Sequence, residues 1–193
     1  MQTFYRYAIP ALWLAWLLCW GAAAMGTKPT QRRESFASQL SHVVPLAMGV
    51  ALLATLRVPF AWLSAPVLPA GAVGFWAGLA LVVAGLGLSI AGRAWLGGNW
   101  SGTVTVKLDH ELIRSGPYRS VRHPIYTGLL LALLGSAIAL REVRGFLGLA
   151  LVALAFLRKI AIEERFLIEQ FGAAYDRYRA EVPALLPMPE RPR

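Results

Sequence analysis

Long uncharged stretches dominate this chain and are separated by short charged segments. Four of them contain at least 17 residues without Asp, Glu, Lys or Arg: 8–25, 35–56, 58–92 and 124–140. A helix needs about 20 apolar residues to cross a membrane core. Pro66 and Pro69 divide the third stretch, because proline inside a helix removes a hydrogen bond. The pattern therefore predicts a short loop there and membrane spans at 8–25, 35–56, 70–92 and 124–140.

A fifth uncharged stretch, Gly145–Leu157, has only 13 residues and is too short to cross a membrane by itself. Residues 141–145 connect it to the fourth span, and a connection this short predicts an antiparallel pair of helices. We expect the fifth helix to continue through Arg158 and Lys159 into 162–164. Its charged end would then lie at the membrane boundary, where charged groups facing protein are candidates for function.

The first span has an alternative interpretation as a secretory signal peptide. Arg6, the apolar stretch and the small residues 21–24 have the order of such a signal. The apolar stretch is longer than usual, however, and it contains Trp13, Trp16 and Trp20. We therefore predict that this segment is a retained membrane span.

The composition supports a membrane protein. Hydrophobic residues make up 57% of the 193 residues and charged residues only 15%, with a mean hydropathy of +0.54. Soluble domains contain roughly 25% charged residues, so a soluble domain is excluded. A disulfide-stabilised fold is excluded as well, because there is one cysteine. The predicted fold class is an all-α integral membrane protein with about five transmembrane helices.

The net charge of +9 has an explanation in the membrane topology. With five spans, 15 of the 19 basic residues fall on one face of the membrane, in residues 26–34, 93–123 and 158–193. Basic residues are enriched in cytoplasmic loops. We therefore predict a multi-pass protein whose amino terminus lies outside and whose polar segments face the cytoplasm. The positive charge does not require nucleic acid as a partner.

The chain divides into two parts. Residues 1–92 contain three spans without motifs, and residues 93–193 form the candidate functional core. This core comprises a cytoplasmic linker (93–123), a helical hairpin (124–162) and a carboxy-terminal cap (163–193). Within the linker, the alternation at 103–106 predicts a short extended segment, and Gly116-Pro117 predicts a turn. Pro124 suits the first turn of the fourth helix.

Six short motifs follow one another in the second part: Asn99-Trp100-Ser101, His110-x-Leu112-Ile113, Gly116-x-Tyr118, Arg122-His123-Pro124-x-Tyr126, Glu163-Glu164, and Val182-Pro183 with Pro187. Through them, residues 93–187 resemble the isoprenylcysteine carboxyl methyltransferases and the related phospholipid methyltransferases. These are membrane enzymes that use S-adenosylmethionine and release S-adenosylhomocysteine. The resemblance implies a cytoplasmic cofactor-binding cap with a helical carboxy-terminal tail.

The resemblance also implies which residues bind the methyl donor. Four of them precede the turn, one follows it, four begin the fourth helix and one lies on the last long helix. They are His110, Glu111, Leu112, Ile113, Tyr118, His123, Pro124, Ile125, Tyr126 and Glu163.

The acceptor end of the site departs from the family pattern. Lys159 stands where the family has an arginine assigned to the acceptor carboxylate, and Arg158 is next to it. Lysine is a point charge without the two-pronged grip of a guanidinium. We expect Lys159 to contact the acceptor and to share a helix face with Glu163, four residues on. Arg158 and Arg122 are further candidates for binding the acceptor.

These features predict carboxyl O-methylation of an isoprenylcysteine-like, lipophilic acceptor. One alternative is N-methylation of a phosphatidylethanolamine-type lipid, which needs a base to remove a proton, and Glu164 is the candidate. Lys159 and Glu164 are thus the candidate catalytic residues. An alternative of another class is a small carrier that binds a lipid or quinone. We predict no metal, since His110 and His123 lie thirteen residues apart without a third ligand.

Overall fold

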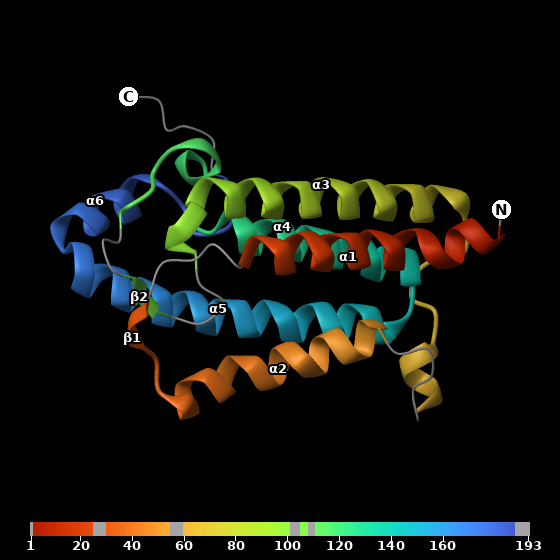
Figure 1. Cartoon of the computed structure of the whole chain (residues 1–193). Coiled ribbons are helices and arrows are strands. Elements are labelled where there is room, and N and C mark those ends of the chain that lie inside the picture. Colours follow the sequence, from red (N-terminus) through yellow and green to blue (C-terminus); the bar gives the residue numbers. More distant parts are fainter. Residues whose placement is uncertain (1, 25–29, 55–59, 101–104, 108–110, 188–193) are drawn as a thin grey trace.

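Five long helices run side by side in the computed structural model of the chain (Figure 1). The structure describes residues 2–24, 30–54, 60–100, 105–107 and 111–187. The long helices are α1 (Gln2–Ala24), α2 (Phe36–Ala54), α3 (Ala72–Leu96), α4 (Pro124–Leu140) and α5 (Val143–Phe171). Three 3₁₀ helices are η1 (Ala61–Ser64), η2 (Gly97–Asn99) and η3 (Gly116–Arg119). The remaining elements are β1 (Thr30–Arg33), β2 (Thr105–Lys107) and α6 (Ala173–Glu181).

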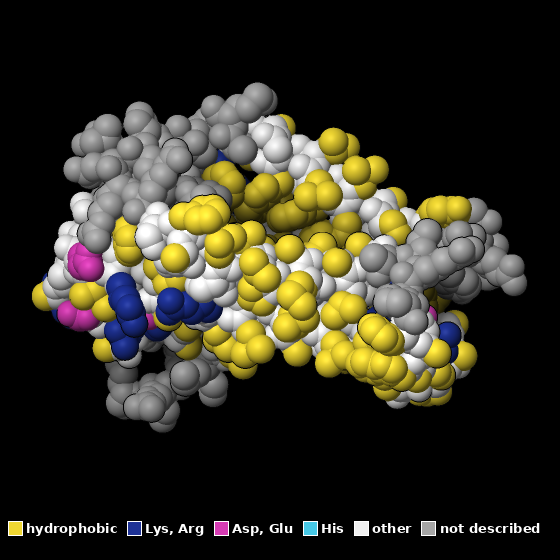
Figure 2. Space-filling view, turned by 90° about the horizontal axis from the view of Figure 1, so that it is seen from below, with side chains coloured by type: hydrophobic (Ala, Val, Ile, Leu, Met, Phe, Trp, Pro, Cys, Tyr) yellow, Lys and Arg dark blue, Asp and Glu magenta, His cyan; other side chains and the backbone are white. Residues whose placement is uncertain are grey.

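Three of the long helices, α2, α3 and α5, have the length and apolar composition needed to cross a membrane. Two shorter apolar helices accompany them, α4 and the Tyr7–Ala23 part of α1. Hydrophobic side chains cover the long middle of the molecule on the face drawn in Figure 2, and charged ones gather toward its ends. Such a surface matches the hydrocarbon core of a bilayer. These observations suggest an integral membrane protein.

Helices α4 and α5 form the predicted hairpin, which extends beyond the predicted end at residue 162. Helix α4 covers the predicted residues 124–140, with Pro124 as its first residue. Helix α5 continues through Arg158 and Lys159 as expected and ends only at Phe171. Arg141 lies between the two helices with a positive φ of 64°. The predicted loop around Pro66 and Pro69 lies between η1 and α3.

The fold is all-helical as predicted, apart from one small sheet between two loops. Strands β1 and β2 form a two-stranded antiparallel sheet, in which Thr30 pairs with Lys107 and Arg33 with Thr105. The sequence predicted an extended segment at 103–106, of which 103 and 104 lie outside the described residues. The partner strand was missed because Thr30–Arg33 is short and polar and shows no alternation of hydrophobic positions. The sheet joins the loop after α1 to the linker after α3.

Helices α3 and α4 pack with their backbones in close contact. A methyl group at Gly85 would overlap the carbonyl oxygen of Gly128 and the backbone nitrogen of Ala132. Small residues permit this approach between membrane helices. Val82 and Ala132, next to the contact, are fully buried.

Replacing Gly85 with alanine should therefore destabilise the protein. The added methyl group meets backbone atoms that cannot move independently, and overpacking typically costs about 1–3 kcal/mol. The matched control is Gly87→Ala, on the same helix, where a methyl group would meet nothing within 4 Å. Thermal unfolding in detergent should show a clear decrease in Tm for the first variant and little change for the second. Equal Tm values would contradict the close packing of α3 on α4.

Helix α1 is attached to the bundle by two indoles. Trp13 Nε1 donates a hydrogen bond to Ser136 Oγ at 3.0 Å, and Trp16 Nε1 donates one to Ser89 Oγ at 2.8 Å. Both rings also pack against an apolar cluster of α3 and α4, and Trp13 packs against a second cluster of α4 and α5 as well. These contacts favour the interpretation of the first span as part of the folded bundle.

Helix α2 packs against α5. A methyl group at Gly49 would lie 2.6 Å from the carbonyl oxygen of Gly148 and 2.7 Å from the Val152 side chain. Near the amino-terminal end of α2, Arg158 Nε donates a hydrogen bond to Ser41 Oγ at 3.2 Å. The residue numbers rise along α2 as they fall along α5, so the two helices are antiparallel. The start of α2 therefore lies beside the charged part of α5.

Candidate functional site

The polar elements gather at one end of the bundle, where α6 and the two strands lie (Figure 1). Helix α5 has 29 residues, which corresponds to about 43 Å at 1.5 Å per residue. A membrane core is about 30 Å thick, so the last turns of α5 extend beyond it. The carboxy-terminal half of α5 carries Lys159, Glu163 and Glu164, and it meets the start of α4 and the carboxy-terminal tail.

A stack of three rings lies between α4 and α5. The ring centroids of His123 and Tyr126 are 5.7 Å apart, and those of Tyr126 and Phe156 are 4.7 Å apart, with nearly parallel planes in both pairs. The Nζ atom of Lys159 lies 5.6 Å from the centroid of the Tyr126 ring. The stack thus combines flat apolar faces with a cation at one side.

Glu163 closes this cluster. Tyr126 Oη donates a hydrogen bond of 2.5 Å to Glu163 Oε1, and His123 Nδ1 lies 3.7 Å from Glu163 Oε2. His123 is buried, whereas the Glu163 side chain is 21% exposed. The carboxylate is therefore held by a ring from α4 and still reaches the surface. We call His123, Tyr126, Phe156, Lys159 and Glu163 the ring cluster.

Glu164 has different surroundings from Glu163. Arg122 donates to Glu164 Oε1 through Nε at 2.9 Å and through a terminal nitrogen at 2.7 Å. His123 Nε2 lies 3.1 Å from the same oxygen, and Arg179 Nε lies 3.8 Å from Oε2. Glu164 thus joins the residues before α4 to α5 and α6. The contacts of Glu164 with Arg122, His123 and Arg179 form what we call the Glu164 clamp.

The carboxy-terminal tail follows the start of α4. The backbone N–H groups of Arg122 and His123 donate to the carbonyls of Pro183 and Ala184 at 2.8 and 3.0 Å. The remaining terminal nitrogen of Arg122 donates to the carbonyls of Arg179 and Val182. These bonds hold residues 179–184 over the motif that contains His123. The guanidinium of Arg122, a sequence candidate for acceptor binding, is thus already hydrogen-bonded within the protein.

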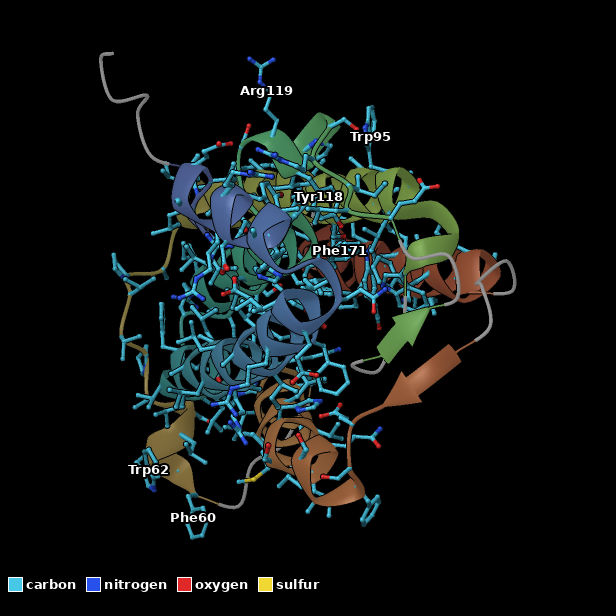
Figure 3. All side chains as sticks on the ribbon, turned by 90° about the vertical axis from the view of Figure 1, so that its left-hand side faces the viewer. Phe60, Trp62, Trp95, Tyr118, Arg119 and Phe171 are labelled. Carbon is cyan, nitrogen blue, oxygen red and sulfur yellow. The ribbon has the colours of Figure 1, made fainter. Side chains whose placement is uncertain are left out.

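Tyr118 and Tyr178 connect the linker to α6. Tyr178 Oη donates a hydrogen bond of 2.6 Å to the carbonyl of Tyr118, whose own hydroxyl donates to the Gly92 carbonyl at 3.3 Å. Burial raises the pKa of Tyr178 to about 12, so its hydroxyl stays protonated and remains a donor. Figure 3 views this end of the molecule and shows Tyr118 pointing inward, while Arg119 and Trp95 point outward.

The structure brings together some of the predicted residues. His123, Tyr126, Glu163 and Lys159 meet in the ring cluster, and buried Pro124 and Ile125 begin α4 beside them. Glu111 is exposed, and Leu112 and Ile113 are half-buried. His110 lies outside the described residues. Arg158 is exposed and contacts Ser41 on α2. That these residues bind a donor or an acceptor stays a prediction.

Sequence reasoning missed a contribution from the first half of the chain. The buried side chains of His42 and Glu34 form a pair, with Nε2 3.5 Å from Glu34 Oε1. Ser38 Oγ donates a hydrogen bond of 2.9 Å to Glu34 Oε2. Ser38 and His42 are four residues apart on α2 and share one helical face, and Glu34, four residues before Ser38, lies just ahead of this helix. No group of three His, Cys, Asp or Glu that could hold a metal occurs in the described parts of the chain.

Comparison with known proteins gives one family match. The model of a family described as phospholipid methyltransferase matches residues 73–174. This range begins in α3 and ends in α6, so it contains the ring cluster, Arg122 and Glu164 but not α1 or α2.

Several relatives are methyltransferases by name. The chain is 37% identical over 81 residues to a protein-S-isoprenylcysteine O-methyltransferase of Schizosaccharomyces pombe, covering 42% of the chain and 34% of the relative. It is 38% identical over 82 residues to a probable protein-S-isoprenylcysteine O-methyltransferase of Oryza sativa subsp. japonica. This match covers 42% of the chain and 43% of the relative. It is 42% identical over 71 residues to methanethiol S-methyltransferase 2 of Bradyrhizobium diazoefficiens. This match covers 36% of the chain and 26% of the relative. The matches thus span less than half the length of these relatives.

Proposed function

This chain belongs to the phospholipid methyltransferase family, and we propose that it is a membrane methyltransferase that uses S-adenosylmethionine and a lipophilic acceptor. The ring cluster carries this proposal. It combines a partly exposed carboxylate with stacked rings, at the end of the bundle where the polar segments cover the apolar helices. Membership in a methyltransferase family supports an enzyme over the carrier interpretation.

The residues of the ring cluster fit the methyl donor. The donor carries a sulfonium cation and an adenine ring, and its methyl group is electrophilic when it is bound. A carboxylate such as Glu163 attracts a cation. We propose that His123, Pro124, Ile125, Tyr126 and Glu163 hold the donor. The linker residues His110, Glu111, Leu112, Ile113 and Tyr118 would complete the pocket.

We propose that the acceptor is an anionic group on a lipophilic molecule, first of all a carboxylate of the isoprenylcysteine type. Lys159 lies over the Tyr126 ring and four residues before Glu163, so a cation for the acceptor adjoins the donor site. Methyl transfer to a carboxylate needs no base. The protein has to align the two reactants and to exclude water. A lipophilic acceptor would reach the site from the bilayer, between the helices.

The alternative of lipid N-methylation requires a base near the acceptor. Glu164 was the candidate for this role, but its oxygens are in contact with Arg122, His123 and Arg179. A carboxylate that is stabilised by three such neighbours is a weak proton acceptor. We therefore assign Glu164 to the clamp and retain carboxyl O-methylation as the first proposal. The basic segments support an orientation in which this end of the bundle faces the cytoplasm.

Replacing Lys159 tests the acceptor. If Lys159 orients a carboxylate, Lys159→Ala should lower turnover of a prenylated cysteine analogue by tenfold or more, or raise its KM, and leave donor binding intact. Lys159→Arg should keep the activity, because a guanidinium binds a carboxylate through two parallel hydrogen bonds. The control is Arg165→Ala, which removes an exposed cation of the same helix and should leave turnover unchanged. Steady-state kinetics with labelled donor measures all three variants.

A lipid amine acceptor predicts the reverse order. A cation repels a protonated amine, so Lys159→Ala would then be harmless or mildly activating. That result would overturn the carboxylate proposal and favour N-methylation.

A further inference from the structure

Helix α3 has a face that the described parts of the chain leave uncovered. From residue 76 onward, its exposed large hydrophobic residues are Trp76, Val83, Ile90 and Trp95. The other exposed residues between 76 and 95 are alanine and glycine. Trp76, Val83 and Ile90 follow one another at intervals of seven residues, close to two helical turns, and so lie on one side of the helix. We call this surface the outer face of α3, and it fits an apolar partner.

Two indoles bracket the outer face of α3 at a spacing that matches a membrane. Trp76 and Trp95 are 51% and 52% exposed, and their separation of 19 residues corresponds to about 28 Å of helix. The hydrocarbon core of a bilayer is about 30 Å thick, and tryptophan is enriched at both of its interfaces. A second copy of the chain would not require indoles at this spacing. The partner that fits the outer face is therefore the bilayer, with one boundary at Trp76 and the other at Trp95.

Helix η1 supports a boundary at the level of Trp76. The N–H group of Val67, just after η1, donates a hydrogen bond of 2.8 Å to the carbonyl of Arg141, between α4 and α5. This bond holds η1 at the end of the bundle opposite α6, where α3 begins (Figure 1). Phe60 and Trp62 are exposed there and point away from the helices (Figure 3). Aromatic rings held in this way fit the interface between headgroups and hydrocarbon.

The ring cluster lies near the other boundary. A methyl group at Gly92, about one turn before Trp95, would lie 3.0 Å from the side chain of Ile125. Ile125 is followed by Tyr126, whose ring centroid lies 5.6 Å from Nζ of Lys159. The Lys159 ammonium, which we assign to the acceptor, therefore lies near the Trp95 boundary and not far out in the water.

This depth restricts which acceptors can react. A group that is joined directly to a hydrocarbon chain reaches the boundary of the core while the chain stays inside it. A group at the end of a polar headgroup is carried farther out, beyond Lys159. It could return only if the headgroup entered the hydrocarbon core, where polar and charged groups are costly. The site should therefore discriminate between acceptors by the length of the polar chain that separates the reacting group from the hydrocarbon.

We propose that the bilayer core extends from Trp76 to Trp95, and that the site thereby selects acceptors whose carboxylate directly follows the hydrocarbon chain. The selection rests on the proposed methyltransferase function, whereas the placement in the bilayer does not. A carboxylate oxygen of the acceptor forms a bond to the donor methyl group as the bond from that methyl to the sulfonium sulfur breaks. The products are a methyl ester and S-adenosylhomocysteine with a neutral sulfur.

Site-directed spin labelling tests the placement in the bilayer. The exposed Cys19 is first replaced by serine. A nitroxide is then attached to one position at a time, in the variants Trp62→Cys, Trp76→Cys, Val83→Cys and Trp95→Cys. The full-length protein is studied in vesicles of phosphatidylcholine and phosphatidylglycerol. Collision rates of the nitroxide with oxygen, which is concentrated in the core, and with a water-soluble nickel complex give the depth of each label.

The label at Val83 should be the deepest, and the labels at Trp62, Trp76 and Trp95 should lie at the interfaces. Arg119→Cys is the control for water, because Arg119 points outward (Figure 3). An interfacial label that is as deep as the one at Val83, or as exposed to water as the one at Arg119, overturns the placement. A label at Val83 that neither reagent reaches would show that a second copy covers the outer face, which also overturns it.

A series of acceptors tests the selection. Three acceptors carry the same prenyl chain and the same terminal carboxylate, and they differ in having no spacer, a short or a long ethylene glycol spacer between the two. In the same vesicles, kcat/KM of the parent protein should fall by about tenfold or more from the first acceptor to the last. Equal or rising values overturn the selection. A protein that methylates none of them and does not bind S-adenosylhomocysteine contradicts the proposed function, whereas the spin labels still decide the placement.

Discussion

Replacing Glu163 with glutamine should reduce the affinity for S-adenosylhomocysteine and S-adenosylmethionine by about thirtyfold or more. Removing one charged partner of a hydrogen-bonded contact commonly costs about 2–5 kcal/mol, and 2 kcal/mol corresponds to about a thirtyfold change in Kd. Glu163 accepts a hydrogen bond from Tyr126 and lies beside His123. It is thus the carboxylate of the ring cluster and the group that we expect to face the cationic donor.

His123→Ala should weaken donor binding in the same way, because it removes one ring from the stack with Tyr126. Titration calorimetry in detergent measures both variants. Asp176→Asn is the control, an exposed carboxylate on α6, and it should bind the donor as the parent does. Unchanged affinity in both Glu163→Gln and His123→Ala would remove the support for a donor site at the ring cluster.

Breaking the Glu164 clamp should have the largest effect on stability. The side chains of Arg122 and Glu164 are only 9% and 13% exposed. Removing one partner of a buried ion pair leaves the other charge buried and typically costs about 3–5 kcal/mol. We expect Arg122→Gln and Glu164→Gln each to reduce the free energy of unfolding by this amount. Residues 179–184 should also become sensitive to proteases, since Arg122 holds them in place.

A double-mutant cycle separates the interaction energy of Arg122 and Glu164 from the other effects of each substitution on stability. The coupling energy between Arg122 and Glu164 should exceed 1 kcal/mol, as for residues in one hydrogen-bonded network. The ion pair of Arg114 and Glu181 provides the comparison, because its side chains are 43% and 60% exposed. Exposed pairs of this kind contribute about 0–1 kcal/mol. Equal coupling energies in the two cycles would contradict the clamp. A Glu164→Gln variant with normal stability but lost turnover would also contradict it and would restore Glu164 as a catalytic base.

The sequence predicted the elements whose ends are marked by local signals. Pro124 and the charged residues after Leu140 delimit α4, and the structure has the same bounds. The continuation of α5 past Arg158 followed from a length argument, since 13 apolar residues cannot cross a bilayer. Glu163 and Lys159 were placed on one face from their spacing alone, and both contact Tyr126.

Contacts between distant segments could not be predicted in this way. The backbone bonds of Arg122 and His123 to Pro183 and Ala184 involve main-chain groups, which leave no trace in side-chain type. The same holds for the pairing of β1 with β2. The pairing of His42 with Glu34 could not be predicted either, because Glu34 lies just before α2, outside the apolar stretch that marks the helix. The assignment of Glu164 changed because Arg122 and Arg179 come from other elements.

Transfer of a labelled methyl group is the most direct test of the central claim. The purified parent protein and the Glu163→Gln variant are incubated with methyl-labelled S-adenosylmethionine, a prenylated cysteine acceptor and total lipid extract. The account predicts label in an organic-soluble product of the parent protein, with much less label in the product of the variant at the same donor concentration. A folded parent protein that transfers no label, or a variant that transfers as much as the parent, would contradict it.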